Sequence, residues 1–412
     1  MPNKQRIESR CMDLSFPRRN QSVGNLKARK WIINQFKEMD FEVLSEKFEF
    51  NEKVRRFYYL KFRILAALFL SLLIVFAIIF SITSNNLIRV VNLFFCLVLL
   101  ITDSYLNSKS DKINKKAYKD RQKYFKKSIK EGENIYVKLE GSSSEQKKAI
   151  MFGAHYDSVS LRFDYRFNTF LYLLGFGAEY LAPLVGIIFY SFYDLISQFF
   201  WIKLILFLMF IVLLSSALFG RIIWFFNRKA NQSEGAVDNA SSVAVLLELA
   251  EIFRKEPPSN LDLYFLTLDA EEEGLFGAYA FVEKHIKELI TQYGKDNILV
   301  PMLDGLGGKG SLGCFVSYGF PIKHSQDKGL YNLISQSAEE LGFSMGSLWS
   351  PYPCGDSVAF AMEGINTIHL FATTLVSNTI SDTKDRVSNK NMLRYTKILE
   401  NFVRNQNRRI AN

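Results

Sequence analysis

The sequence contains little cysteine and little histidine, with four residues of each among 412. The cysteines stand at positions 11, 96, 314 and 354, and no two of them have the CxxC spacing. We therefore expect free thiols, which suit a reducing compartment. The first twenty residues contain no apolar core, so we expect no signal peptide there.

Long apolar runs, by contrast, are present in two blocks. Residues 63–83, RILAALFLSLLIVFAIIFSIT, lack a polar face, which favours a membrane span over a buried core helix. Residues 87–106 follow after a short polar gap, and the block 167–226 contains two more apolar runs, the first with Pro183 near its start. We predict two helical hairpins with four spans, and so a multi-pass membrane protein.

Positive charge gathers beside these apolar runs. The net charge of +10 suggests an anionic partner, and its distribution points to lipid rather than nucleic acid. By the positive-inside rule, we expect the termini and the large polar segments on the cytoplasmic side. The segment 109–130 is strongly basic, and we interpret it either as a solvated helix or as a contact with anionic lipid. The oligomeric state stays open.

Outside the apolar blocks, strand-like and helix-like segments alternate. Apolar strand-like runs end near residues 155, 268 and 303, and helical patterns cover 239–255 and 276–290. This alternation predicts an α/β sheet that is covered on both faces. Ligands gather at the strand ends of such sheets.

Potential metal ligands follow several of these strands and precede one helix. An imidazole with carboxylates is a ligand set for zinc or a similar divalent ion. Neighbouring carboxylates near a core also need a cation or a proton to neutralise them. Each residue alone has an ordinary explanation, such as an N-cap for Asp238. Their joint occurrence predicts one shared site, made of His155, Asp157, Asp238, Glu271, Glu272 and Asp304.

The order and spacing of these residues resemble the zinc-dependent exopeptidases of metallopeptidase family 28, of the aminopeptidase and glutamate carboxypeptidase type. The resemblance rests on the motifs GAHYDSV, GAVDNASSVAVLLELA, DAEEEGLFGAYAF, MLDGLG, GDSVAFAMEGI and SDTKD. It implies a three-layer, mixed-sheet α/β zinc-peptidase domain of the phosphorylase/hydrolase-like kind, interrupted here by two transmembrane helical hairpins. The expected peptidase segments are 1–56, 107–166 and 227–412, and the hairpins are 57–106 and 167–226.

The resemblance also implies a role for each residue of the site. His155 and Asp304 bind one metal, Glu272 binds a second, and Asp238 bridges the two. Glu271 is the general base that takes a proton from the attacking water, and Asp157 orients the imidazole of His155. A cis peptide bond is expected after Asp238. Glu273 and Asp269 are interpreted as bystanders.

One position departs from the family pattern. The family's last ligand is a histidine, but the corresponding stretch NTISDT places Asn378 there. Because an amide oxygen is a poorer zinc ligand than an imidazole, the number of zinc ions, one or two, stays open. His369 lies nine residues earlier and is interpreted as a core or strand-end residue. Ser357 also replaces a histidine that is common in relatives.

The leading interpretation is a membrane-embedded metallopeptidase, an aminopeptidase before a carboxypeptidase, that hydrolyses a peptide substrate. The alternative is a catalytically impaired pseudopeptidase that binds peptides or proteins, which Asn378 favours and the otherwise intact residue set opposes. A transporter or channel is less favoured, because the predicted spans contain few charges. Glutaminyl cyclases share the fold, but their single zinc depends on the histidine that Asn378 replaces.

Overall fold

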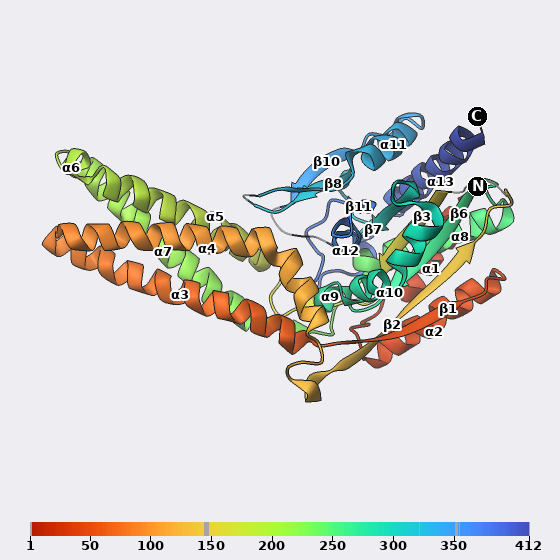
Figure 1. The fold of residues 1–412 in the computed structure, drawn as a ribbon, viewed down its shortest axis with the longest axis horizontal. Coiled ribbons are helices and arrows are strands. Elements are labelled where there is room, and N and C mark those ends of the chain that lie inside the picture. Colours follow the sequence, from red (N-terminus) through yellow and green to blue (C-terminus); the bar gives the residue numbers. More distant parts are fainter. Residues whose placement is uncertain (1, 144–147, 321, 351–352, 354, 412) are drawn as a thin grey trace.

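A mixed β-sheet lies beside a bundle of long apolar helices that extends to one side of it (Figure 1). The computed structural model describes residues 2–143, 148–320, 322–350, 353 and 355–411. Within these residues the sheet has nine strands in the order β1-β2-β6-β3-β7-β11-β8-β10, with β9 paired to β8. The strands are β1 (Leu44–Phe50), β2 (Lys130–Leu139), β3 (Lys148–His155), β6 (Leu261–Leu268), β7 (Ile298–Leu303), β8 (Leu312–Tyr318), β9 (His324–Ser325), β10 (Gly346–Ser350) and β11 (Asn366–Ala372).

The centre of the sheet is parallel. Strand β3 pairs in parallel with β6 on one side and β7 on the other, and β7 pairs in parallel with β11. Strands β1 and β2 continue the sheet antiparallel beyond β6, and β8 is antiparallel to β11. The central strands are buried on both faces, which explains why their sequences are continuous apolar runs. The predicted three-layer mixed-sheet fold is confirmed.

Helices cover both faces of the sheet, and each face has its own apolar core. In α8, for example, Leu246, Leu249 and Phe253 recur at helical spacing and are buried, and the helix ends at Lys255, shortly before two prolines. One face is covered by α1 (Lys4–Leu14), α2 (Val23–Glu38), α8 (Ser241–Lys255), α11 (Lys328–Glu339) and α13 (Asn389–Ala411); the other by α10 (Phe276–Tyr293) and α12 (Ser357–Ala361).

The bundle contains the apolar runs of the sequence. Its helices are α3 (Glu52–Thr83), α4 (Asn86–Lys119), α5 (Tyr165–Ser191), α6 (Tyr193–Ile196) and α7 (Phe200–Phe226). Among the described residues, three helical stretches are long and apolar enough to cross a membrane: Glu52–Thr83, Asn86–Leu106 and Phe200–Ile223. Helix α5, with Pro183 inside it, is not one of these three. The fourth span therefore stays a prediction.

One ion pair of Arg221 joins the two hairpins near their base, and a second joins two helices of the same hairpin. Arg221 of α7 lies 2.6 Å from an oxygen of Asp103 in α4 and 3.1 Å from one of Glu179 in α5. At the opposite end, Arg89 of α4 lies 2.8 Å from Asp194 of α6. Because charged groups inside an apolar bundle are costly unless they pair, the contacts of Arg221 help to fix how the helices are arranged, whereas the Asp194 side chain is 83% exposed.

The basic segment 109–130 does not form a separate element. Helix α4 continues through it as far as Lys119, and a short 3₁₀ turn covers Lys126–Ser128. Residues 109–119 thus extend helix α4 beyond its apolar part. The contact with anionic lipid stays a prediction.

Candidate active site

Three parallel strands bring the predicted site residues to one edge of the sheet. His155 is the last residue of β3, Asp304 directly follows β7, and the pair Glu271 and Glu272 follows β6. These two glutamates begin the short helix α9 (Glu271–Gly274). Because β3 lies between β6 and β7 in parallel, the carboxyl ends of all three strands meet.

The side chains of His155, Asp238 and Asp304 converge on one point. His155 Nε2 lies 3.2 Å from Asp238 Oδ1 and 3.6 Å from Asp304 Oδ1, and one ligand atom from each of the three lies within 4.8 Å of the others. Within the described chain, Asp238 Oδ1 is buried and accepts no hydrogen bond. A buried carboxylate oxygen in that state calls for a cation. One imidazole and two carboxylates fit a zinc ion.

A tight turn positions Asp238. Gly235 precedes it with φ +57°, and a Cβ at this glycine would lie 2.8 Å from the Asp238 carbonyl oxygen, so the turn requires glycine. The carboxylate of Asp382 accepts from the N–H groups of Val237 (2.7 Å) and Asp238 (3.0 Å). The peptide bond between Asp238 and Asn239 is cis, as the resemblance implied.

Asp157 connects the imidazole to the glutamate turn. Its two carboxylate oxygens accept from the N–H groups of Glu271 (3.1 Å) and Glu272 (3.2 Å). The same carboxylate lies 3.5 Å from His155 Nδ1, and the carbonyl oxygen of Asp157 lies 3.1 Å from that nitrogen. Asp157 is thus placed to orient both the ring and the turn, which suits its predicted role.

Glu271 lies beside the converging ligands. Its Oε2 is 4.0 Å from His155 Nε2, the ring nitrogen that faces Asp238 and Asp304. Burial raises the pKa of Glu271 well above its ordinary value, with a charged His155 opposing the shift. A carboxylate with a raised pKa, next to the ligands and outside the converging set, has the properties of a general base.

Asn378 faces Glu272, the predicted ligand of a second metal. With the amide oriented as its surroundings require, its nitrogen donates to both Glu272 oxygens, at 2.7 Å to Oε2 and 2.5 Å to Oε1. Asn378 has φ +60°, a conformation that asparagine adopts more readily than most residues. In the described chain Glu272 is outside the converging set of ligand atoms. A hydrogen-bond donor thus faces Glu272 where the family pattern expects a metal ligand.

His369 is a member of the site that the sequence interpretation missed. It is buried on strand β11, as expected, but its Nε2 lies 3.6 Å from Asp304 Oδ2. The φ of Gly355 is +63°, and a Cβ there would lie 2.3 Å from His369 Nδ1, so glycine is required against the ring. Burial lowers the pKa of His369, which favours the neutral imidazole.

Asp356, which follows Gly355, is a second group that the sequence interpretation missed. It is buried, and burial raises its pKa to about 8. Asp356 belongs to the motif GDSVAFAMEGI, whereas the place of His369 depends on the parallel pairing of β11 and β7, which sets it opposite Met302, two residues before Asp304.

The remaining predicted residues lie around the site rather than in it. Asp269 accepts from the side-chain amides of Asn20 (2.9 Å) and Asn25 (3.0 Å), which ties α2 and the segment before it to the end of β6. Glu273 pairs with cations and is described below. Ser357 accepts from Gln326 at 2.8 Å.

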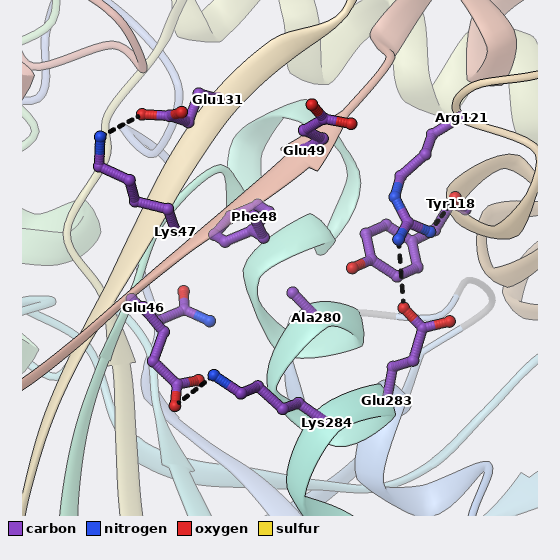
Figure 2. A pocket seen from close by; sticks show the side chains of 11 residues that line it. Glu46, Lys47, Phe48, Glu49, Tyr118, Arg121, Glu131, Ala280, Glu283 and Lys284 are labelled. Atoms are coloured by element: carbon purple, nitrogen blue, oxygen red, sulfur yellow. Dashed lines mark hydrogen bonds and ion pairs between the residues drawn. The ribbon is translucent and has the colours of Figure 1, made fainter.

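A separate hollow of about 380 Å³ lies between β1, α10 and the end of α4 (Figure 2). The charged side chains around it pair with one another: Lys47 with Glu131 at 3.0 Å, Lys284 with Glu46 at 2.9 Å, and Arg121 with Glu283 at 3.4 Å. Because these charges already neutralise one another, the hollow presents no convergent set of free polar groups. We assign it no function.

Comparison with known proteins agrees with the fold. Residues 223–403 match the model of peptidase family M28. The structure is similar to the aminopeptidase from Aneurinibacillus sp. strain AM-1, with TM-score 0.55, 14% identity, and coverage of 98% of this chain and 93% of that chain. It is also similar to BSAP, a zinc aminopeptidase from Bacillus subtilis (TM-score 0.55, 12% identity, 98% and 95% coverage).

A glutaminyl cyclase from an Acidobacteriales bacterium has TM-score 0.53 and 14% identity, over 99% of this chain and 95% of that chain. At these identities the likeness establishes the fold. No curated protein matches the sequence. The family match covers Asp238, Glu271 and Asp304, and it agrees with the three-layer fold. Together these findings indicate a metallopeptidase: residues 223–403 match family M28, and the chain has the fold of the similar aminopeptidases.

Proposed function

We propose that the chain is a membrane-embedded exopeptidase, an aminopeptidase, that hydrolyses peptides with one tightly bound zinc ion. The observation that carries the proposal is the convergence of His155, Asp238 and Asp304, with Glu271 only 4.0 Å from the imidazole. The names of the similar structures support an aminopeptidase before a carboxypeptidase.

His155, Asp238 and Asp304 would bind the zinc ion. When bound, it would supply a Lewis acid that polarises the scissile carbonyl and makes a water molecule easier to deprotonate. Glu271 accepts the proton from the attacking water and delivers it to the leaving amine nitrogen. Asp157 fixes the position of the glutamate turn relative to the imidazole of His155 through the hydrogen bonds described above.

We propose one tight metal site because of the contact between Asn378 and Glu272. The Asn378 amide donates hydrogen bonds to both Glu272 oxygens, which are the atoms that a second ion would need as ligands. A second ion would have to displace this contact and would gain at most an amide oxygen, a poor zinc ligand. We therefore expect a second ion only at high metal concentration.

The same observation favours a second candidate, a pseudopeptidase that binds peptides without cleaving them. In that case the remaining metal would have a structural role. The replacement by Asn378 would have removed the second ion and, with it, the catalytic activity. Glu271 favours the active candidate, because its carboxylate lies 4.0 Å from the imidazole of His155 and outside the converging set of ligand atoms.

We further propose that the helices of the bundle cross a membrane and that the peptidase domain faces the cytoplasm. The three apolar helices support the first part, and the basic residues near their ends support the second. Anionic lipid is the proposed partner of the basic segment 109–130.

The test is metal analysis of the purified protein together with hydrolysis of a peptide panel that includes free and acetylated amino termini. We expect about one zinc per chain and cleavage of peptides with free amino termini only. His155→Ala should lose both zinc and activity. If the wild-type protein retains zinc but cleaves no peptide, the pseudopeptidase candidate replaces the active one.

A further inference from the structure

Both helical hairpins leave the peptidase domain next to the turn that carries the two glutamates. Helix α3 begins at Glu52, two residues after strand β1, and contacts α9. The other hairpin is joined to the domain by a separate two-stranded sheet, β4 (Ser160–Leu161) paired with β5 (Lys229–Ala230), and β5 follows α7 after two residues. In Figure 1, α9 lies between the base of the bundle and the sheet.

The third glutamate of the turn, Glu273, is a buried carboxylate that pairs with Lys229 at the base of the second hairpin and with Arg19 in the segment before α2. Its side chain is fully buried. Its Oε1 accepts from Arg19 Nε at 2.8 Å, and its Oε2 lies 3.3 Å from Lys229 Nζ. Arg19 also lies 3.8 Å from Glu52, the first residue of α3. A buried carboxylate is stable only when nearby positive charges neutralise it. The ion pairs of Glu273 therefore hold the turn against the bases of the hairpins.

The backbone of the turn is also bound by residues at the bases of the two hairpins. Lys229 Nζ donates to the carbonyl oxygen of Glu272. Arg55, in the first turn of α3, donates to the carbonyl oxygen of Glu273 at 3.4 Å and to Asn114 of α4 at 3.0 Å. A Cβ at Gly274 would lie 2.6 Å from the Arg55 side chain, so the chain passes close against it.

We propose that Lys229 and Arg55 are positioning residues, and that through them the two hairpins set the position of Glu271 and Glu272. Lys229 reaches the turn from the end of α7, and Arg55 reaches it from the start of α3. Neither residue contacts the converging ligands, so each acts through the turn. The inference rests on the proposed peptidase function for its kinetic effect, but its structural part can be measured without activity.

The physical reason for a large effect is the sensitivity of a general base to its position. A misplacement of about 1 Å can cost roughly 10²-fold in rate. Without Lys229, the carbonyl of Glu272 loses a donor, and Glu273 loses one ion pair and keeps the one with Arg19. The turn is then held less firmly, by Arg55, Arg19 and the hydrogen bonds to Asp157, whereas His155, Asp238 and Asp304 keep their places on other elements.

The experiment compares Lys229→Met, Lys229→Arg and Arg228→Met in the full-length protein. Arg228 is the neighbouring cation and is exposed, so its substitution controls for the loss of a positive charge at the end of α7. We expect Lys229→Met to lower kcat about tenfold or more, with KM within twofold and zinc content unchanged. Lys229→Arg should restore most of kcat, and Arg228→Met should behave as wild type.

Hydrogen exchange of the peptide covering residues 269–276 provides a readout that does not need turnover. We expect faster exchange in Lys229→Met than in wild type or Arg228→Met. If exchange and kcat are both unchanged in Lys229→Met, the positioning role is wrong. If the wild-type protein cleaves nothing, the proposed function fails while faster exchange would still support the positioning role, and unchanged exchange would overturn it.

Discussion

At the residue scale, the adjacent residues Glu271 and Glu272 have different surroundings, and we therefore propose different roles for them. Glu271 faces the imidazole of His155, whereas the carboxylate of Glu272 is covered by the amide of Asn378. Burial raises the pKa of both carboxyls, and the nearby Asp238 raises that of Glu272 further. A cation relieves this repulsion at the ligands, and a hydrogen-bond donor relieves it at Glu272.

Replacement of Asn378 by histidine tests whether this residue limits the metal content. The imidazole would provide a good zinc ligand where Glu272 and Asp238 are already near, and histidine tolerates the positive φ better than most residues. We expect zinc to rise from about one towards two ions per chain and peptidase activity to rise with it. Asn378→Gln is the control. Two tightly bound ions in the wild type would show that another residue completes the second site.

At the element scale, the ends of the parallel strands account for most of the site. The apolar runs that end at His155, Leu268 and Leu303 could be recognised in the sequence, so the strand ends and their polar residues could be predicted. The contact of His369 with Asp304 could not, because it depends on β11 lying beside β7 rather than at the edge of the sheet.

The orientation of the Asn378 amide and the cations around Glu273 were also beyond the sequence. Asn378 and Glu272 are far apart in the chain, and only packing decides which atom of the amide faces the carboxylate. Likewise, the sequence shows Lys229 as one of several basic residues next to a span, without indicating that it turns towards the glutamate turn.

Helix α1 is fixed to α8 by buried charges, which gives a prediction about stability. The fully buried side chain of Glu248 accepts from Arg6 Nε at 2.6 Å and from Arg10 Nη1 at 3.2 Å. Glu248→Ala would leave the buried Arg10 with Glu251 as its remaining carboxylate. We expect the free energy of unfolding to fall by about 3 kcal/mol, measured by denaturant unfolding in detergent.

The matched control for Glu248 is Lys47→Ala, because Lys47 pairs with Glu131 on the surface, where both side chains are more than half exposed. An exposed pair contributes less than about 1 kcal/mol, so this variant should unfold nearly as the wild type does. Equal losses in the two variants would contradict the importance of burial at α1.

At the scale of the whole molecule, the bundle contacts the sheet domain beside the site and also along α4. The first hairpin contacts α9 through α3, α4 contacts α10 and α12, and the ion pair between Arg221 and Asp103 joins the two hairpins. The insertion of apolar helical hairpins after β1 and between β4 and β5 is compatible with the fold, because the central strands stay contiguous in space.

The proposed topology can be tested by cysteine labelling in sealed cells with a reagent that does not cross membranes. Lys123→Cys and Lys309→Cys place thiols at exposed positions of the polar part of the chain, and Asn86→Cys places one at the tip of the first hairpin. We expect only the thiol at position 86 to react from outside, because the basic flanks favour the cytoplasm. Outside labelling at 123 or 309 would reverse the orientation.

The central claim is that Glu271 acts as a general base beside a zinc ion bound by His155, Asp238 and Asp304. The most direct measurement is kcat and zinc content, determined in parallel for the wild type and Glu271→Gln. Because general-base catalysis contributes about 10²–10⁴-fold, we expect kcat to fall by that factor while both proteins bind the same amount of zinc. Cleavage by Glu271→Gln at the wild-type rate would contradict the account.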